Sequence, residues 1–101
     1  MYNDANLSAP AAYMPIESHR LHVFHAVAAN GSIAEAARRM CLTRSALSHA
    51  LRTLEDELGC DLFSRSEKRI TLTAAGLRLL PHARAILDEM ARARLSVAGG
   101  A

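Results

Sequence analysis

Five side chains between residues 44 and 52 have the types and the spacing needed to bind a polyanion. They recur at i, i+1, i+4, i+5 and i+8, so on a helix they share one face, all can donate hydrogen bonds and none is acidic. The positive N-terminal end of such a helix would add to their attraction for phosphate. A solvated face usually alternates charge signs, so the pattern favours nucleic-acid binding over a merely soluble surface. The five residues are Arg44, Ser45, Ser48, His49 and Arg52.

The spacing of leucines on the opposite side predicts the helix that carries this face. Leucines stand at i, i+4, i+7 and i+11, which makes one apolar stripe, and Thr43 is placed to cap the helix before it. The acids of the stretch gather near its end, away from the donors. The stripe consists of Leu47, Leu51, Leu54 and Leu58.

A shorter helix is predicted just before it, with Ser32 as its cap. Only Cys41 and Leu42 separate its last apolar residue from Thr43, and so short a link forces the two helices to cross sharply. The pair therefore reads as a helix-turn-helix. The stripe of the first helix is Ile33, Ala36, Ala37 and Met40.

A further helix is expected before this pair. A helix from Glu17 to Ala29 would end at Asn30-Gly31, a good left-handed stop, with a buried face of Leu21, Phe24, Val27 and Ala28.

After Gly59, two short strands over 62–65 and 69–72 predict a β-hairpin wing around Ser66-Glu67-Lys68. Leu62 and Phe63 must anchor this hairpin, because an isolated hairpin is marginal in water. We expect Arg65, Lys68 and Arg69 to project from its edge and contact the DNA backbone.

A last helix is predicted from Ala74 to about Ser96, capped by Thr73, bent by Pro81 and stopped by Gly99-Gly100. At roughly 34 Å it would overreach a body of this size. An apolar stripe that overreaches its own domain needs a partner, so we expect this helix to dimerise. The stripe consists of Leu77, Leu80, Leu87 and Met90.

Composition limits the class of protein. The chain has 101 residues, half of them hydrophobic but only 4% aromatic, which indicates one mainly helical domain. The formal net charge is only +2, so a nucleic-acid footprint would be local. No apolar run is long enough to span a membrane and no secretory signal is evident, so we expect a cytoplasmic protein. Cys41 and Cys60 lack metal-ligand spacing, and we interpret them as reduced packing thiols.

Catalytic and metal chemistry find little support. His19, His22 and His25 recur every three residues, but such steps drift around a helix and no cysteine lies near them, so we reject a zinc site and expect no metal or cofactor. No Ser–His–acid or Cys–His constellation and no glycine-rich phosphate loop occurs, and the acids are expected on solvated helix ends. We therefore do not expect an enzyme.

The run AAxxMxxTxxALSxxLxxLEDELGxxLFxR followed by LTxAG, within residues 16–95, resembles the DNA-binding domain of LysR-type transcriptional regulators. The resemblance implies a mainly α winged helix-turn-helix over residues 16–72 and a linker helix over 73–98 that pairs two subunits. It further implies a sequence-specific regulator that reads an inverted-repeat operator as a dimer or dimer of dimers, through a recognition helix in the major groove of double-stranded DNA.

The same resemblance assigns roles to residues. Phosphate-binding positions map onto Ser32, Thr43, Ser48 and Arg65, and we add Arg52, Lys68 and Arg69 from their charge. Base-reading positions map onto Arg44, Ser45 and His49. The family commonly has Gln-Pro where this chain has Arg44-Ser45; since Arg favours guanine and Gln adenine, the operator would differ from the usual one.

Family members carry a C-terminal effector-binding domain, so we interpret this chain as the DNA-binding part of a longer regulator. A small-molecule inducer would act only through that other domain. Residues 1–15 are expected to form an N-terminal arm, and 99–101 follow the linker helix. One alternative stays open, in which the basic face docks an acidic protein instead of DNA.

Overall fold

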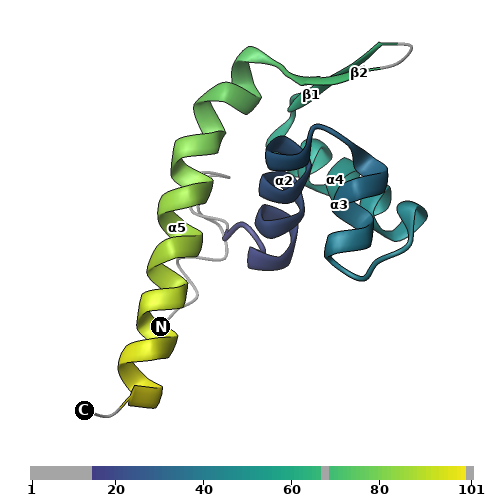
Figure 1. The fold of residues 1–101 in the computed structure, drawn as a ribbon. Coiled ribbons are helices and arrows are strands. Elements are labelled where there is room, and N and C mark those ends of the chain that lie inside the picture. Colours follow the sequence, from purple (N-terminus) through teal and green to yellow (C-terminus); the bar gives the residue numbers. More distant parts are fainter. Residues whose placement is uncertain (1–14, 67–68, 100–101) are drawn as a thin grey trace, which may run out of the picture.

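The computed structural model describes residues 15–66 and 69–99. In this part the chain folds into helices packed around one core, with an antiparallel β-hairpin at one end (Figure 1). The predicted winged helix-turn-helix with a long final helix is confirmed. The elements are α2 (Ser18–Asn30), α3 (Ile33–Arg39), α4 (Arg44–Leu58), β1 (Phe63–Ser66), β2 (Arg69–Leu72) and α5 (Ala74–Gly99). Residues 1–14 of the expected arm, Lys68 and Gly100 lie outside the described residues.

Three helices begin at the predicted caps. The hydroxyl of Ser32 accepts from the backbone N–H of Glu35 at 3.1 Å, and that of Thr43 from Ala46 at 3.0 Å. Thr73 accepts from the N–H of Gly76 at 3.1 Å. Each bond satisfies one of the donors that a helix start leaves unpaired.

The turn between α3 and α4 is a Schellman motif with a cysteine at its left-handed position. Cys41 has φ +57° and donates its N–H to the carbonyl of Arg38 at 3.2 Å, while Leu42 donates to that of Ala37 at 2.9 Å. These two bonds close the end of α3 within the two predicted link residues. Cys41 and Cys60 are both exposed, so our interpretation of them as packing thiols is wrong. Each follows a helix end on the solvent side of the turn.

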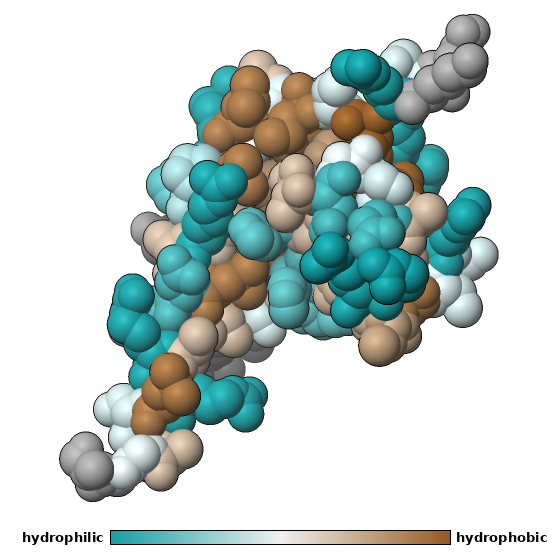
Figure 2. All heavy atoms as spheres, in the orientation of Figure 1, coloured by the Kyte–Doolittle hydropathy of each residue, from teal (hydrophilic) through white to brown (hydrophobic). Residues whose placement is uncertain are grey.

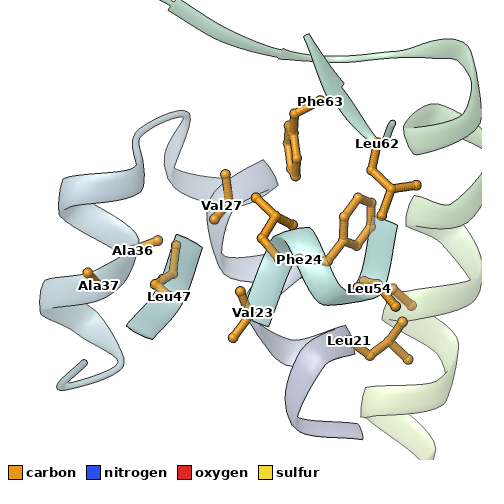
Figure 3. Close-up of a cluster of buried hydrophobic side chains, with 12 residues drawn as sticks. Leu21, Val23, Phe24, Val27, Ala36, Ala37, Leu47, Leu54, Leu62 and Phe63 are labelled. Atoms are coloured by element: carbon orange, nitrogen blue, oxygen red, sulfur yellow. The ribbon is translucent and has the colours of Figure 1, made fainter. Parts of the chain in front are cut away.

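The core lies where α2 packs against α3, α4 and α5 (Figure 3). The ring of Phe24 from α2 meets that of Phe63 from β1 with centroids 5.5 Å apart and planes tilted by 47°. This aromatic pair anchors the wing, as expected for Leu62 and Phe63. The fully buried large side chains are Leu21, Val23, Phe24, Val27, Leu47, Leu51, Leu54 and Leu62.

Several boundaries differ from the predictions. The leucine stripe of α4 ends one turn early, because Leu58 is exposed beside the helix-ending Gly59. Strand β1 starts at Phe63 instead of residue 62, and α2 runs one residue later than expected at both ends. Helix α5 continues through Gly99, since one glycine in a helical conformation costs only about 1 kcal/mol relative to alanine.

Helix α5 lies along α2 and extends beyond the body of the domain (Figure 1). Its 26 residues correspond to about 39 Å. Figure 2 shows hydrophobic side chains recurring along its length on the visible face. None of the helices in the described residues is both long enough and apolar enough to cross a membrane.

Candidate nucleic-acid interface

The polar face of α4 is turned to solvent. Arg44, Ser45, His49 and Arg52 are exposed and Ser48 is half-buried. Leu47, Leu51 and Leu54 on the other side of the helix are completely buried, which fixes the rotation of α4 about its axis. The structure therefore presents together, on one helix, all five donors that the sequence placed on one face.

The two arginines of this face are not engaged by acids. In residues 15–66 and 69–99, neither Arg44 nor Arg52 forms an ion pair, whereas Arg20 is paired with Glu57 at 2.8 Å. An ion pair with a carboxylate offsets part of an arginine's positive charge and occupies some of its donors. Among the residues that the structure describes, no carboxylate engages Arg44 or Arg52 in this way.

The cap hydroxyls of Ser32 and Thr43 keep a donor of their own. Each accepts a backbone N–H with its oxygen, and the hydroxyl hydrogen stays available for a second bond. Thr43 is exposed and Ser32 half-buried at the starts of α4 and α3. Both positions therefore combine a hydroxyl donor with the positive end of a helix.

The end of α3 carries a cluster that sequence reasoning did not single out. The carboxylate of Glu35 accepts hydrogen bonds from both Arg38 and Arg39. These bonds lower the pKa of Glu35 and raise the pKa of Arg38, because each favours the charged form of its partner. Two of the positive charges near the turn are thus partly neutralised.

The hairpin register separates two of the wing arginines. Arg65 lies opposite Ile70, and Arg69 lies opposite Ser66. Side chains alternate between the faces of a hairpin, so Arg65 shares the inward face with Phe63, and Arg69 lies on the other face. Arg65 and Arg69, which we expected to project from the edge of the hairpin, are both exposed but lie on opposite faces of it. Lys68 lies outside the described residues.

The main residue that sequence reasoning missed is Glu55. This residue is only 5% exposed, although we expected the acids to lie on solvated helix ends. One carboxylate oxygen, Oε2, accepts the backbone N–H groups of Leu62 at 2.8 Å and Phe63 at 3.3 Å. The other, Oε1, lies 3.4 Å from a guanidinium nitrogen of Arg65. The signal was its spacing, since Glu55 follows Leu51 by four residues and therefore stands beside the apolar stripe.

The expected dimerisation stripe of α5 divides into two kinds of position. Leu77 is 60% and Met90 47% exposed, whereas Leu80 is half-buried against the core. Leu87 is half-buried beside a groove between α5 and the first turns of α2. The side chains of His19 and His22 line the same groove. Within the residues that the structure describes, no three histidines, cysteines or acids lie close enough together to hold a metal ion.

A known family matches the elements that carry this site. The family described as bacterial regulatory helix-turn-helix proteins of the lysR family matches residues 18–77, from the start of α2 to the first turn of α5. The chain belongs to the LysR family. Every element described above except the distal part of α5 falls within the matched range.

Two regulators of this family illustrate the extent of the similarity. The chain is 45% identical over 82 residues to the transcriptional regulator ShiR of Corynebacterium glutamicum, and 39% identical over 83 residues to HdfR of Escherichia coli. These matches cover 81% and 82% of the chain. The chain spans only 28% of the length of ShiR and 30% of the length of HdfR.

Solved LysR-type structures share the fold. The DNA-binding domain of CbnR, solved in complex with DNA, is 37% identical with a TM-score of 0.77, and the match covers 85% of this chain and 100% of that one. The DNA-binding domain of BenM with benA site 1 DNA is 27% identical with a TM-score of 0.79 and the same coverage. A mutant of OxyR from Corynebacterium glutamicum is 35% identical with a TM-score of 0.78, over 87% of this chain and 28% of that one.

Proposed function

We propose that this chain is the DNA-binding domain of a sequence-specific transcription regulator of LysR type. The observation that carries the proposal is the exposed face of α4, where all five predicted donors lie together and both arginines lack an acidic partner in the described residues. The similar domains of CbnR and BenM were solved with DNA, which supports the same role here.

We assign the residues of the interface to two tasks. Helix α4 enters the major groove, where base edges differ between all four base pairs, and its first turns read them. The remaining groups bind phosphates and set the position of the helix on the duplex. The base-reading residues are Arg44, Ser45 and His49; the phosphate-binding residues are Ser32, Thr43, Ser48, Arg52, Arg65, Lys68 and Arg69.

The regulator acts as a homodimer joined through α5, and a symmetric dimer reads an inverted-repeat operator. The exposed apolar positions of α5, Leu77 and Met90, are the contacts we assign to this interface. Control by a small molecule belongs to other parts of the regulator. The protein works on DNA in the bacterial cytoplasm and catalyses no reaction.

Selection of bound duplexes from a random pool tests the DNA-binding role directly. We expect an inverted repeat whose half-sites contain a guanine facing Arg44, because an arginine binds the O6 and N7 atoms of guanine with two hydrogen bonds. Enrichment of no sequence, together with weak binding that is insensitive to salt, would favour an acidic protein as the partner instead.

Replacing Arg44 with Ala should cost about 1–3 kcal/mol on the selected duplex and flatten discrimination at one base pair of each half-site. Arg52→Ala is the matched control, since it removes the same side chain from the same face two turns later. The control should weaken binding to every sequence alike. Competition titrations with single-base variants of the operator measure both effects, and a uniform loss for Arg44→Ala would make Arg44 a phosphate contact.

A further inference from the structure

A single carboxylate connects the recognition helix to the wing. Glu55 of α4 accepts two backbone N–H groups at the start of β1 and lies near the guanidinium of Arg65 further along the same strand. It is also the one charged side chain in the described residues that is buried. Glu55 therefore fixes one strand of the wing to the helix that carries the base-reading face.

The two carboxylate oxygens have different tasks. Oε2 takes both backbone donors, Leu62 and Phe63, and these bonds offset the cost of burying the charge. Within residues 15–66 and 69–99, Oε1 has only Arg65, at the long distance of 3.4 Å. A staple for the backbone would need only Oε2, so the position of Oε1 points to a second task directed at Arg65.

Glu55 engages only part of the guanidinium of Arg65. The side chain of Arg65 is 36% exposed, and a guanidinium has five N–H donors, of which Glu55 faces only one amino group. No other acceptor in the described part of the chain engages the remaining donors, which can bind a second acceptor. An arginine that a carboxylate already holds in place loses less conformational entropy when a phosphate binds it.

We propose that Glu55 is a positioning residue for DNA binding, which fixes the wing to α4 and holds the guanidinium of Arg65 ready for a backbone phosphate. The proposal rests on the DNA-binding function proposed above. It predicts that an acidic residue strengthens binding to a polyanion. By charge alone, Glu55 should instead weaken that binding by repulsion.

The test compares Glu55→Gln with a matched control, Glu57→Gln. Both changes remove one negative charge from α4 and keep the size of the side chain. Glu57 pairs with Arg20 of α2 instead of the wing. Binding to the selected operator and to a duplex of mixed sequence is measured over a range of salt concentrations, for each variant alone and combined with Arg65→Gln. Thermal melts followed by circular dichroism show that each variant is folded at the temperature of the titration.

We expect Arg65→Gln to lower the slope of log K against log salt by about 0.9 for each wing that loses a phosphate. Glu55→Gln should lower the slope by a similar amount on both duplexes, because the contact is to the DNA backbone. Adding Arg65→Gln to Glu55→Gln should then change little. Glu57→Gln should leave the slope unchanged or strengthen binding. In the double variant, the effects of Glu57→Gln and Arg65→Gln on binding should simply add.

A different pattern overturns the proposal. If Glu55→Gln lowers the melting temperature but binds DNA as well as the wild type, Glu55 only staples the backbone. If Arg65→Gln has its full effect with or without Glu55, the two residues act separately. If Glu55→Gln does not fold, Glu55→Asp keeps the charge but shortens the reach to Arg65, and we expect the same loss of slope. Failure of the wild type to bind any duplex would instead refute the DNA-binding function itself.

Discussion

Cys41 carries the main backbone strain in the helix-turn-helix. A residue with a Cβ at φ +57° has its side chain close to the backbone, a conformation that glycine adopts freely. The two hydrogen bonds of the Schellman motif hold it there. The strain lies in the link that sets the angle between α3 and the recognition helix.

Cys41→Gly should therefore stabilise the domain by about 0.5–1 kcal/mol, because relief of strain exceeds the added flexibility of the unfolded chain. Urea denaturation followed by circular dichroism measures the free energy of unfolding. Gly59→Ala is the opposite control. Its φ of +73° stays left-handed and a Cβ there meets no atom within 4 Å, so a loss of about 1 kcal/mol would come from conformation alone. A destabilised Cys41→Gly would mean that the thiol itself contributes to the turn.

Particular residues show which features of the site the sequence could predict and which it could not. The donors of α4 were predictable, because spacing alone places Arg44 and His49 opposite the leucines. Glu55 was not recognised, because its buried partners are backbone N–H groups of residues 62 and 63, which have no side-chain signature. The left-handed φ of Cys41 was equally invisible, since nothing in a cysteine favours that conformation.

Among the helices and strands, local chemistry predicted where most helices begin. The register of the hairpin determined which of its residues share a face. The caps Ser32, Thr43 and Thr73 were predictable because each satisfies donors within its own first turn. The faces of the hairpin were not predictable, because a shift of one residue exchanges them. That shift is what places Arg65 toward Glu55 and Arg69 on the other face.

Gly76 lies at a close contact between the start of α5 and the hairpin, which the motif LTxAG alone does not reveal. A Cβ at this position would lie 2.2 Å from the carbonyl oxygen of Leu62 and 2.8 Å from Cδ2 of Leu72. The first turn of α5 therefore packs directly on the backbone that precedes β1. No side chain larger than hydrogen fits unless the first turn of α5 or the backbone that precedes β1 moves.

Gly76→Ala should destabilise the domain by about 1–3 kcal/mol, because backbone atoms must shift to admit the methyl group. Gly99→Ala makes the same substitution in the same helix, where a Cβ meets nothing within 4 Å. That control should be neutral or stabilising by up to about 1 kcal/mol. Chemical denaturation of both variants decides; equal effects would show that the contact at Gly76 relaxes without cost.

The rest of the molecule covers only part of the apolar surface of α5. Leu77 and Met90 are exposed on the helix, and Leu95 nearer its end is 71% exposed. Isolated apolar side chains on a surface are ordinary, but their recurrence along one helix fits an interface with a second copy. Leu80 is half-buried against the core, so a partner would cover the outer positions and leave Leu80 in place.

Met90→Asp should convert a dimer into a folded monomer. Burial of a methionine side chain contributes roughly 1.5–3 kcal/mol, and a symmetric dimer loses two such contributions. The dissociation constant of the dimer should therefore rise by about 10²–10⁴-fold. Ala74→Asp places the same acid at the exposed start of α5 and should leave the dimer intact. Sedimentation at micromolar concentration distinguishes the two. A wild type that sediments as a monomer would remove α5 as the dimer contact.

The way α5 is attached makes it a lever. Its first turn is seated on the backbone at Gly76 and Ala83 is fully buried, whereas all residues from Asp88 to Gly99 are exposed. The sixteen residues that follow Ala83, up to Gly99, form an arm of about 24 Å, so a 10° tilt about Ala83 would carry its far end through about 4 Å. A displacement too small to disturb the core would thus become a shift comparable to the rise of one DNA base pair.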